Sequence, residues 1–591
     1  MAENNENLVN GEEAKKSRND QEFLAKLRSW QKSERDSRVK KELTWYEIQL
    51  VLDGAHYTIL PDKDRSTSTS IRITPIKKRK GEIMRVYNKT RALLRTLKAN
   101  TTATEIRYEV QGDNNDEIMA GNYLNWYVDK DPTFPEVVGD VVTLGFKREK
   151  GYFYPYWDSQ KRQPMVIACD PFDLLVDRYG KYALRTYTMR KEDLKNAKGA
   201  EGPLFKNLDA IKSTTKRSAS DIYDNYLRSK NQSGQGEDKY DLSDVLLEEY
   251  HIIEQKEVEV KEGEASAGKV SSQTRIVTTS EDFNAIHNEE VYDEDELCFI
   301  EFCPERNAEP WLADALDPQR TLDNMYSHME EFYRVMGKGR MIKRKGVKTD
   351  RIADRDGQVI EYDGPDSSKP EFVNPGSIGG DQFNFFGLVS QAMEDAVGQH
   401  PDQVRKTETA RGIGYLMAQD QTNISEPWKN LKTSLIKLGH KLIKLGNRHM
   451  MASQDIFWWH QNQMQEAKVI GASSPQEESP ESVYHIKNPK ALRVHLIPKG
   501  EFAALAKEEK VMKLAQLRIL TNPEIIANAL NIGDVREIVD KEMAFRKANP
   551  QPTPGAVPGQ PQAPTAPQDP ESGLREMVSD LEADLSNLPT G

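Results

Sequence analysis

Cysteine is scarce in this chain, and long apolar runs are missing. Three cysteines among 591 residues, Cys169, Cys298 and Cys303, are too few and too unevenly placed for a disulfide framework or a structural zinc site. No apolar run approaches the roughly 18 residues that a membrane span requires, and residues 1–20 contain no hydrophobic segment typical of a signal peptide. We therefore expect a protein that assembles in the cytoplasm and is neither secreted by a standard signal nor integral to a membrane.

Motifs typical of enzymes are also missing. The segment GKGRMIKRKG at 337–346 lacks the spacing of a Walker motif, and none of the ten histidines forms an HExxH pair. There is no serine nucleophile elbow. Cys298 and Cys303 bracket the strand-like residues FIEF without neighbouring histidines in the sequence, which indicates buried thiols. We therefore expect a protein that is not an enzyme and that has no cofactor or metal.

The composition indicates a globular protein with a polar surface. Apolar residues make up 37% of the chain, charged residues make up 30%, and the formal net charge is −12. A negative net charge argues against a general surface that binds nucleic acid, because phosphate contacts depend on Lys and Arg. Any contact with DNA is therefore expected to be confined to local basic patches.

The clearest structural signal is one long amphipathic helix from about Ser425 to Met451. Its apolar residues recur at alternating steps of three and four, which predicts a narrow seam buried against other helices. The seam consists of Trp428, Leu431, Leu435, Leu438, Leu442 and Leu445. The lysines off this seam, which we expect to remain solvated, are Lys429, Lys432, Lys437, Lys441 and Lys444. At 1.5 Å per residue the helix would be roughly 40 Å long, and a polar segment precedes it as a loop.

Two shorter helices are predicted upstream, at 311–336 and 381–397, with a basic module between them. The first has apolar residues from Leu322 to Met336 at steps of three and four, and the second has a similar seam that ends at Val397. The module at 337–380 contains short β-prone runs and an Asp356-Gly357 turn, which predicts a hairpin.

The remaining segments alternate between helical and β-rich patterns, so the fold class predicted is α+β, mainly α. Residues 1–22 are expected to be disordered, and charged helices follow. The runs VVTLGF, YFYPYW and MVIACDPFDLLVD between 140 and 178 predict a small sheet, and the polar stretch 199–290 predicts a peripheral hairpin. Further strands are expected up to residue 500, and helices at 501–549. A Pro-rich linker at 550–570 and an amphipathic helix at 571–591 complete the chain.

This order of segments resembles the portal protein of tailed bacteriophages, of the short-tailed type. The similarity depends on Arg38, Trp45, Tyr46 and Gly54 in the N-terminal layer, and on the hairpin GYFYPYWDSQKRQPMVIACDPFDLLVD. It also depends on the series of helix, small module, helix, loop and long helix from 311 to 451. The similarity covers about residues 25 to 545, and its strength lies in the order of the patterns.

The resemblance implies a ring, generally of twelve copies, with four named domains. It implies a wing domain at 23–310, which includes the 199–290 insertion, and a stem made of a first helix at 311–336 and a second at 381–397, with a clip at 337–380 between them. A tunnel-loop region follows at 398–423. A spine helix with returning wing strands is implied at 424–500, and crown helices at 501–549. The helix at 571–591 resembles the barrel that some short-tailed phages add.

The function implied is that of a virion protein at the capsid vertex. Double-stranded DNA would be packaged and ejected through the ring, which would also bind the terminase motor, the tail adaptor, and the major capsid and scaffolding proteins. The alternative is a metal-dependent nucleic-acid-processing enzyme of phage origin, with metal ligands among Asp350, Asp354, Asp356 and Glu361.

Two groups of candidate site residues follow from the resemblance. The tunnel-loop group, expected to make weak contacts in the channel, is Gln399, Gln403, Arg405, Lys406, Thr407 and Thr409. The clip group, expected to bind a protein partner, is Lys338, Arg340, Lys343, Arg344, Lys345 and Lys348. An ordinary polar loop over a helix end and a solvated basic hairpin remain the alternatives.

Overall fold

The structure is a computed structural model of the whole chain. It describes residues 2–60, 73–76, 83–102, 104–110, 115–158, 161–199, 202–208, 244–257, 270–280, 286–292, 296–306, 309–336, 340–345, 359–362, 371–373, 380–400, 422–460, 463–471 and 483–498. These residues belong to one compact unit, residues 1–499. The predicted crown helices, Pro-rich linker and C-terminal helix lie outside the described residues.

The chain begins with one long helix, α1 (Ala2–Leu52). We predicted disorder over 1–22, so the structure differs there. The polar residues at the start include Ala, Glu and Lys, which favour helix, and no proline interrupts them before the amphipathic part of α1 begins. The helix ends at Leu52, and in the turn that follows Gly54 has a φ of +78°, a conformation that glycine adopts without steric cost.

The C-terminal half of α1 packs on the turn that follows β5 (Gln163–Cys169). Nη1 of Arg38 donates to the carbonyl oxygens of Pro171 and Leu174, at 2.8 and 2.7 Å. The rings of Trp45 and Tyr46 lie 5.4 and 4.6 Å from the ring of Phe172. Three of the residues that carry the family resemblance therefore meet at one place, where they hold α1 against the small sheet.

Three helices form the centre of the described unit: α2 (Lys89–Thr102), α3 (Asn115–Lys130) and α4 (Phe134–Arg148). The prediction of a strand for VVTLGF is wrong, because these residues are the last turns of α4. Its buried residues, spaced for one helical face, are Phe134, Val138, Val141, Val142 and Phe146. β-Branched residues favour strands only weakly, and burial along a helical face outweighs that preference here.

The predicted small sheet forms from β4 (Gly151–Asp158), β5 and β13 (Ile300–Phe302), in the order β13-β4-β5. A second sheet has the order β12-β11-β10-β7-β6 and is antiparallel throughout. Its strands are β6 (Leu174–Val176), β7 (Tyr182–Arg190), β10 (Asp244–Glu257), β11 (Val270–Ser280) and β12 (Ile286–Tyr292). A short helix, α5 (Lys191–Asn196), follows β7. The two-residue strands β1 (Thr58–Ile59) and β2 (Thr74–Pro75) pair, as do β8 (Lys198–Gly199) and β9 (Gly202–Pro203).

The hairpin predicted within 199–290 is confirmed as β10 and β11, but it is not peripheral. Strand β10 is the middle strand of its sheet, with β7 on one side and β11 on the other. Leu247 and Tyr250 on β10 are fully buried. The polar composition of this segment suggested an insertion. Strand β10 instead packs its buried side chains against Leu24 and Leu27 in the first half of α1 and forms a small hydrophobic core with them.

The long predicted helix is α11 (Ser425–His449), and the middle of its seam is buried, while Trp428 and Leu445 at the two ends are half-buried. Leu431, Leu435, Leu438 and Leu442 are each at most 1% exposed and belong to the main core. Lys441, which we expected to be solvated, is only 5% exposed, because strands cover α11 on more than one side.

The last described strands are β17 (Gln454–His460), β18 (Gln463–Gly471), β19 (Val483–Ile486) and β20 (Leu492–Pro498), as predicted. The first three form a sheet in the order β17-β18-β19, and β20 pairs antiparallel with β3 (Thr104–Val110). The α+β class is therefore confirmed. Among the described residues no helix is both long and apolar enough to cross a membrane.

Candidate functional site at the root of paired helices

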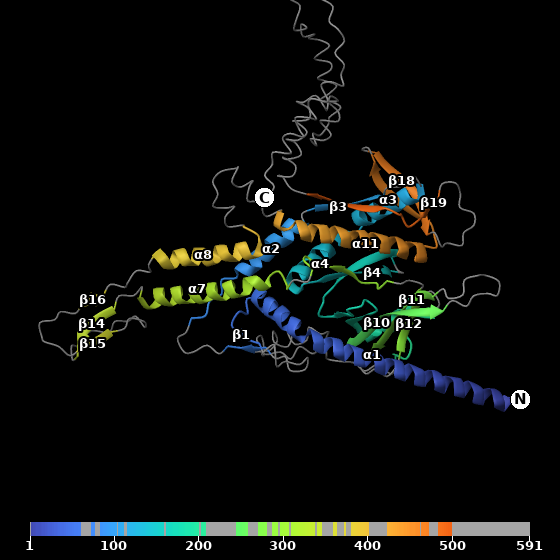
Figure 1. Cartoon of the computed structure of the whole chain (residues 1–591), viewed down its shortest axis with the longest axis horizontal. Coiled ribbons are helices and arrows are strands. Elements are labelled where there is room, and N and C mark those ends of the chain that lie inside the picture. Colours follow the sequence, from blue (N-terminus) through green and yellow to red (C-terminus); the bar gives the residue numbers. More distant parts are fainter. Residues whose placement is uncertain are drawn as a thin grey trace, which may run out of the picture. The chain divides into compact units, whose positions relative to one another are not determined.

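The candidate site is built on two helices that lie side by side, α7 (Leu316–Met336) and α8 (Gly380–Val397) (Figure 1). A short 3-10 turn, η2 (Ala313–Ala315), precedes α7. At 1.5 Å per residue each helix is roughly 30 Å long. Both helices were predicted from their apolar seams, to within a turn or so at each end. The chain runs outward along α7 and returns along α8, and a small sheet lies at the outer end of the pair (Figure 1).

The small sheet differs from the predicted hairpin. It comprises β14 (Arg340–Arg344), β15 (Val359–Tyr362) and β16 (Glu371–Val373). Strand β14 pairs parallel with β15 and antiparallel with β16, so β14 and β15 cannot be the two arms of one hairpin. Short β-prone runs indicate strands, but they carry no information about the direction of pairing.

The basic residues that were predicted for a clip fall on and next to β14. Arg340, Lys343 and Arg344 belong to this strand, and Lys345 follows it as an exposed residue. Lys338 and Lys348 lie outside the described residues. The sheet therefore places four of the six predicted basic residues within one strand and the residue after it.

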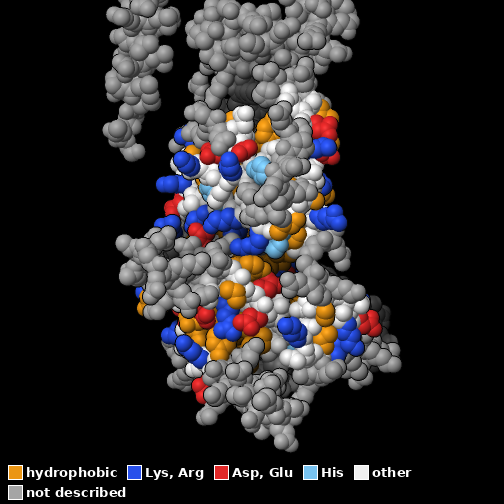
Figure 2. Space-filling view, turned by 90° about the vertical axis from the view of Figure 1, so that its right-hand side faces the viewer, with side chains coloured by type: hydrophobic (Ala, Val, Ile, Leu, Met, Phe, Trp, Pro, Cys, Tyr) orange, Lys and Arg blue, Asp and Glu red, His pale blue; other side chains and the backbone are white. Residues whose placement is uncertain are grey.

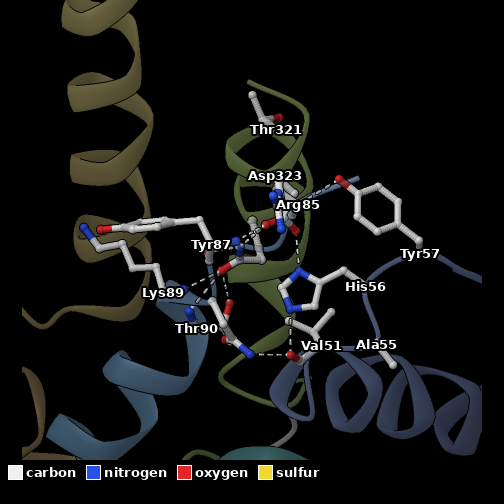
Figure 3. Close-up of polar contacts among 12 residues, drawn as sticks. Val51, Ala55, His56, Tyr57, Arg85, Tyr87, Lys89, Thr90, Thr321 and Asp323 are labelled. Carbon is white, nitrogen blue, oxygen red and sulfur yellow. Dashed lines mark hydrogen bonds and ion pairs between the residues drawn. The ribbon is translucent and has the colours of Figure 1, made fainter. Parts of the chain in front are cut away.

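A polar stripe along the root of α7 holds that helix to the N-terminal layer (Figure 3). Gln319, Asp323 and Ser327 are four residues apart and are at most 8% exposed. Oε1 of Gln319 accepts hydrogen bonds from the backbone nitrogens of Lys89 and Thr90, each at 3.0 Å. These nitrogens belong to the first turn of α2, where N–H groups lack partners within the helix. Gln319 thus caps α2 from another helix.

The stripe continues outward through Asp323 and Ser327. Asp323 Oδ1 accepts from the backbone nitrogen of Tyr87 at 2.8 Å, and its Oδ2 atom contacts Nδ1 of His56. Ser327 Oγ accepts from the backbone nitrogen of Arg85 at 2.9 Å. Both His56 and Asp323 side chains are 3% exposed, so this contact is shielded from solvent. The segment just before α2 therefore lies along α7 as a hydrogen-bonded strap.

Lys89 connects this strap to the second helix of the pair. Its Nζ atom lies 2.8 Å from Oε1 of Glu394 on α8 and 2.9 Å from the carbonyl oxygen of Ser390. Lys89 and Glu394 are 5% and 1% exposed, so the ion pair is buried. One residue thereby fixes α7, through its backbone nitrogen, and α8, through its side chain.

The two ends of the 401–421 segment are held together at the base of α8. Gly398, with φ of +69°, follows the helix, and Nδ2 of Asn423 donates to its carbonyl oxygen at 3.1 Å. A Cβ atom at residue 398 would lie 3.2 Å from Nδ2 of Asn423, so glycine suits both the turn and the close approach. Trp311 Nε1 donates to the carbonyl oxygen of Val397 at 3.0 Å. Since α11 begins at Ser425, the segment starts and ends on fixed backbone.

Gln399 is the one predicted tunnel-loop residue that the structure describes, and it differs from the expectation. Its side chain is fully buried, and its Oε1 atom accepts from Nδ2 of Asn100 at 2.5 Å. A buried, hydrogen-bonded amide is not available for contact with DNA, so in this chain Gln399 fixes the loop base. Gln403, Arg405, Lys406, Thr407 and Thr409 lie outside the described residues.

The outer part of the pair exposes large apolar side chains. Phe383, Phe385 and Leu388 on α8 are 48%, 52% and 63% exposed, and Tyr326 and Tyr333 on α7 are 41% and 53% exposed. Single exposed apolar residues are ordinary, but five large ones on one helix pair are more than scattered exposure usually supplies, which favours a partner for this pair.

The sequence did not lead us to predict the polar residues that fix the root of α7 and α8. Gln319, Asp323 and Ser327 do have helical spacing, so a polar stripe beside the apolar seam was visible. Their partners, such as Lys89, lie more than 200 residues away in the chain, and no local pattern connects them. The described residues contain no group of three potential metal ligands.

Comparison with known proteins does not place this chain in a family. No protein-family model matches the sequence, and no curated protein matches it.

Proposed function

We propose that this chain is the subunit of a phage portal, a ring at the capsid vertex through which viral DNA is packaged and ejected. The observation that carries the proposal is the helix pair α7 and α8. It is fixed at its root by buried polar contacts and joined to a small sheet at its outer end, and it exposes apolar side chains between them. A helix pair with these features is suited to pack against another copy of the chain.

The exposed apolar residues support assembly. A helix that exposes Phe383, Phe385 and Leu388 by 48%, 52% and 63% would favour association, since burial of apolar area contributes roughly 25 cal/mol per Å². If the matching surface is a different face of the neighbouring copy, the contact is head-to-tail and a ring forms when the rotation closes. The family resemblance implies twelve copies.

The fixed loop base supports a channel role for residues 401–421. The backbone on either side of this segment is held by the hydrogen bond from Asn423 to Gly398, so α8 and α11 are fixed independently of residues 401–421. Charge is also compatible with a channel. The net charge is −12, and basic and acidic side chains are interspersed on the face shown in Figure 2. A conduit has to release DNA, and few strong phosphate contacts make release easier.

The outer sheet is the proposed docking point for the terminase motor and the tail adaptor. Its basic residues Arg340, Lys343, Arg344 and Lys345 would meet an acidic protein surface, which favours encounter and orientation. The wing would contact the major capsid and scaffolding proteins. In this proposal the protein belongs to the virion and is not an enzyme.

Mass measurement tests the proposal. The purified full-length protein should give particles near twelve times 67.3 kDa, with an axial hole in negative-stain images. The double variant Phe385→Ser, Leu388→Asn should lower the particle mass while leaving the folded monomer intact, because both side chains are exposed. Tyr179→Ser is the matched control, since Tyr179 is 80% exposed but lies outside the pair, and it should leave the rings unchanged. Only monomers at every concentration, with scaffolding protein present, would contradict the proposal.

Deletion of residues 403–409 tests the channel role separately. Rings should still form, because the loop base at Gly398 and Asn423 is retained, but completion of packaging or retention of DNA should fail. Loss of rings would instead make the segment structural. A metal-dependent nuclease activity abolished by Asp356→Ala would favour the alternative function.

A further inference from the structure

A cavity of about 490 Å³ lies between one face of α11 and the segment 296–301, which leads into β13. Its wall also includes Ile253 of β10, Gly180 in the turn before β7, and Asn488 after β19. This volume falls within the roughly 300–1,000 Å³ that is usual for a small-molecule pocket. The charged residues of the lining are Lys437, Lys441, Lys444, Glu296 and Glu301.

Hydrogen bonds fix the walls of the cavity. Oγ of Ser434 on α11 donates to the carbonyl oxygen of Glu301 at 2.7 Å, which holds the helix against β13. Nδ1 of His440, one turn and a half further along α11, lies 2.9 Å from Oδ1 of Asn488. An amide oxygen only accepts, so the imidazole donates in this contact. Because the walls are already held in place, a ligand would bind without a large cost of reorganisation.

Three lysines of α11 reach the cavity from one face of the helix. Lys437, Lys441 and Lys444 are four and three residues apart, and like charges at these spacings repel one another. Lys441 is only 5% exposed, and burial of an ammonium group costs free energy. A bound anion would reduce both costs. An ammonium group has three N–H donors, so Lys441 can bind a ligand oxygen and still keep a contact with the protein.

The two glutamates at the cavity are close to lysines of their own. Oε2 of Glu301 accepts from Nζ of Lys150 at 3.0 Å, and Oε2 of Glu296 lies 3.6 Å from Nζ of Lys444. With Lys150 included, four lysines accompany two glutamates among the residues described here, which leaves an excess of two positive charges. The cavity therefore favours an anion over a cation.

The rest of the lining is largely apolar. Leu297, Phe299 and Ile300 form it together with Ile253. The ring of Phe299 is itself fixed, since it stacks on the ring of Tyr154 at 5.0 Å. An inorganic anion would leave this apolar surface in contact with water, whereas a ligand with a carbon body would cover it. The lining thus combines a basic side with an apolar side.

We propose that this cavity is a binding site for a small organic phosphate. The phosphate group would lie against Lys437 and Lys441, since lysine binds phosphate as a point charge, and the carbon body would lie against Phe299 and Leu297. A phosphate ester carries close to two negative charges at neutral pH, which matches the excess charge of the site. The inference depends neither on ring assembly nor on DNA in a channel.

Binding to the full-length protein tests the proposal, with phenyl phosphate, inorganic phosphate and phenol as probes. In calorimetric titrations at constant ionic strength, phenyl phosphate should saturate one site per chain. Inorganic phosphate should bind about tenfold more weakly because it leaves the apolar side uncovered, and phenol should not bind at the same concentrations. Absence of saturable phenyl phosphate binding would overturn the proposal. So would a site that binds a duplex oligonucleotide but not phenyl phosphate.

Variants on α11 locate the site. Lys441→Met keeps most of the apolar stem and removes the charge, and Lys437→Gln changes an exposed residue that the fold does not need. Each should weaken phenyl phosphate binding about tenfold. Lys432→Gln is the matched control, because Lys432 is an exposed lysine of the same helix outside the cavity lining, and it should leave the affinity unchanged. Equal affinities in all three variants would place the ligand elsewhere and contradict the assignment.

Lysine acetylation gives a second readout on the unmodified protein. Saturating phenyl phosphate should slow acetylation of Lys437 by N-hydroxysuccinimidyl acetate about fivefold or more, as followed by peptide mass spectrometry. Lys432 should react at the same rate with and without the ligand. Equal protection of both lysines, or of neither, would argue against a ligand in this cavity, and this result decides the matter even if Lys441→Met fails to fold.

Discussion

Nζ of Lys89 lies 2.8 Å from Oε1 of Glu394, and both side chains are almost completely buried. The backbone nitrogen of Lys89 is bonded to Gln319 on α7, while its side chain is bonded to α8. Two helices that are separate in sequence therefore share one fixed point at the start of α2.

Removal of one partner of this ion pair should destabilise the protein strongly. Glu394→Leu leaves the Lys89 ammonium buried without its counter-charge, which costs roughly 3–5 kcal/mol of unfolding free energy. The double variant Lys89→Met, Glu394→Leu should recover most of that loss, because no buried charge remains. Urea unfolding measures the free energy of unfolding of the single and the double variant. Asp140→Asn is the control, since its contact with Lys98 is largely exposed and an exposed pair is worth at most about 1 kcal/mol. Equal losses in the single and double variants would contradict the argument.

Gln319→Leu should remove the cap on α2. The backbone nitrogens of Lys89 and Thr90 would then be buried without an acceptor, at a cost of about 2 kcal/mol. The midpoint of thermal unfolding should fall. Hydrogen exchange should also accelerate in the first turn of α2. The control is Thr321→Ala, a change at a half-buried residue two positions away on α7 that makes no contact with α2 in the hydrogen bonds described, and it should leave α2 protected.

Gly439→Ala should destabilise the protein, whereas Gly387→Ala should not. A Cβ atom at residue 439 would lie 2.7 Å from Leu492 Cδ2 and 2.7 Å from Tyr108 Cε1, and overpacking of this kind costs roughly 1–3 kcal/mol. A Cβ atom at Gly387 would meet nothing within 4 Å. Alanine favours helix over glycine by about 1 kcal/mol, so the change in α8 should be neutral or stabilising. Urea midpoints of the two variants compare them directly.

Stability should decrease between about pH 6.5 and pH 9 because of His251. Its pKa is raised to about 9 in the folded chain, from the ordinary value near 6.5. A histidine whose pKa is higher in the folded chain than in the unfolded chain stabilises the fold fully at pH values below its unfolded pKa. This contribution is lost as the pH rises through about 9. The loss is on the order of 3 kcal/mol. Urea titrations at several pH values measure it. His251→Gln should flatten the dependence, and His495→Gln, at an exposed residue, should leave it unchanged.

Helices with one apolar seam were predicted correctly from the sequence. In α11 most of the seam is buried in the core, because a spacing of three and four residues places side chains on one side of a helix wherever that helix packs. In α7 the helix was found, but its buried side chains include, beside Leu322, the polar residues Gln319, Asp323 and Ser327. The strands from β17 to β20 were found for a similar local reason. The strand prediction for VVTLGF was wrong because its residues suit both a buried strand and a buried helix. Only the elements that pack around α4 decide between the two.

By itself, the sequence determined where α7, α8, α11 and the strands β17 to β20 lie, since these depend on residues a few positions apart. Only the tertiary structure decided which distant groups meet. The capping of α2 by Gln319, the burial of Gln399 and the parallel pairing of β14 with β15 all join segments through space. The energy of a buried hydrogen bond or ion pair depends on both partners and on the exclusion of water, and no single stretch of chain contains that information.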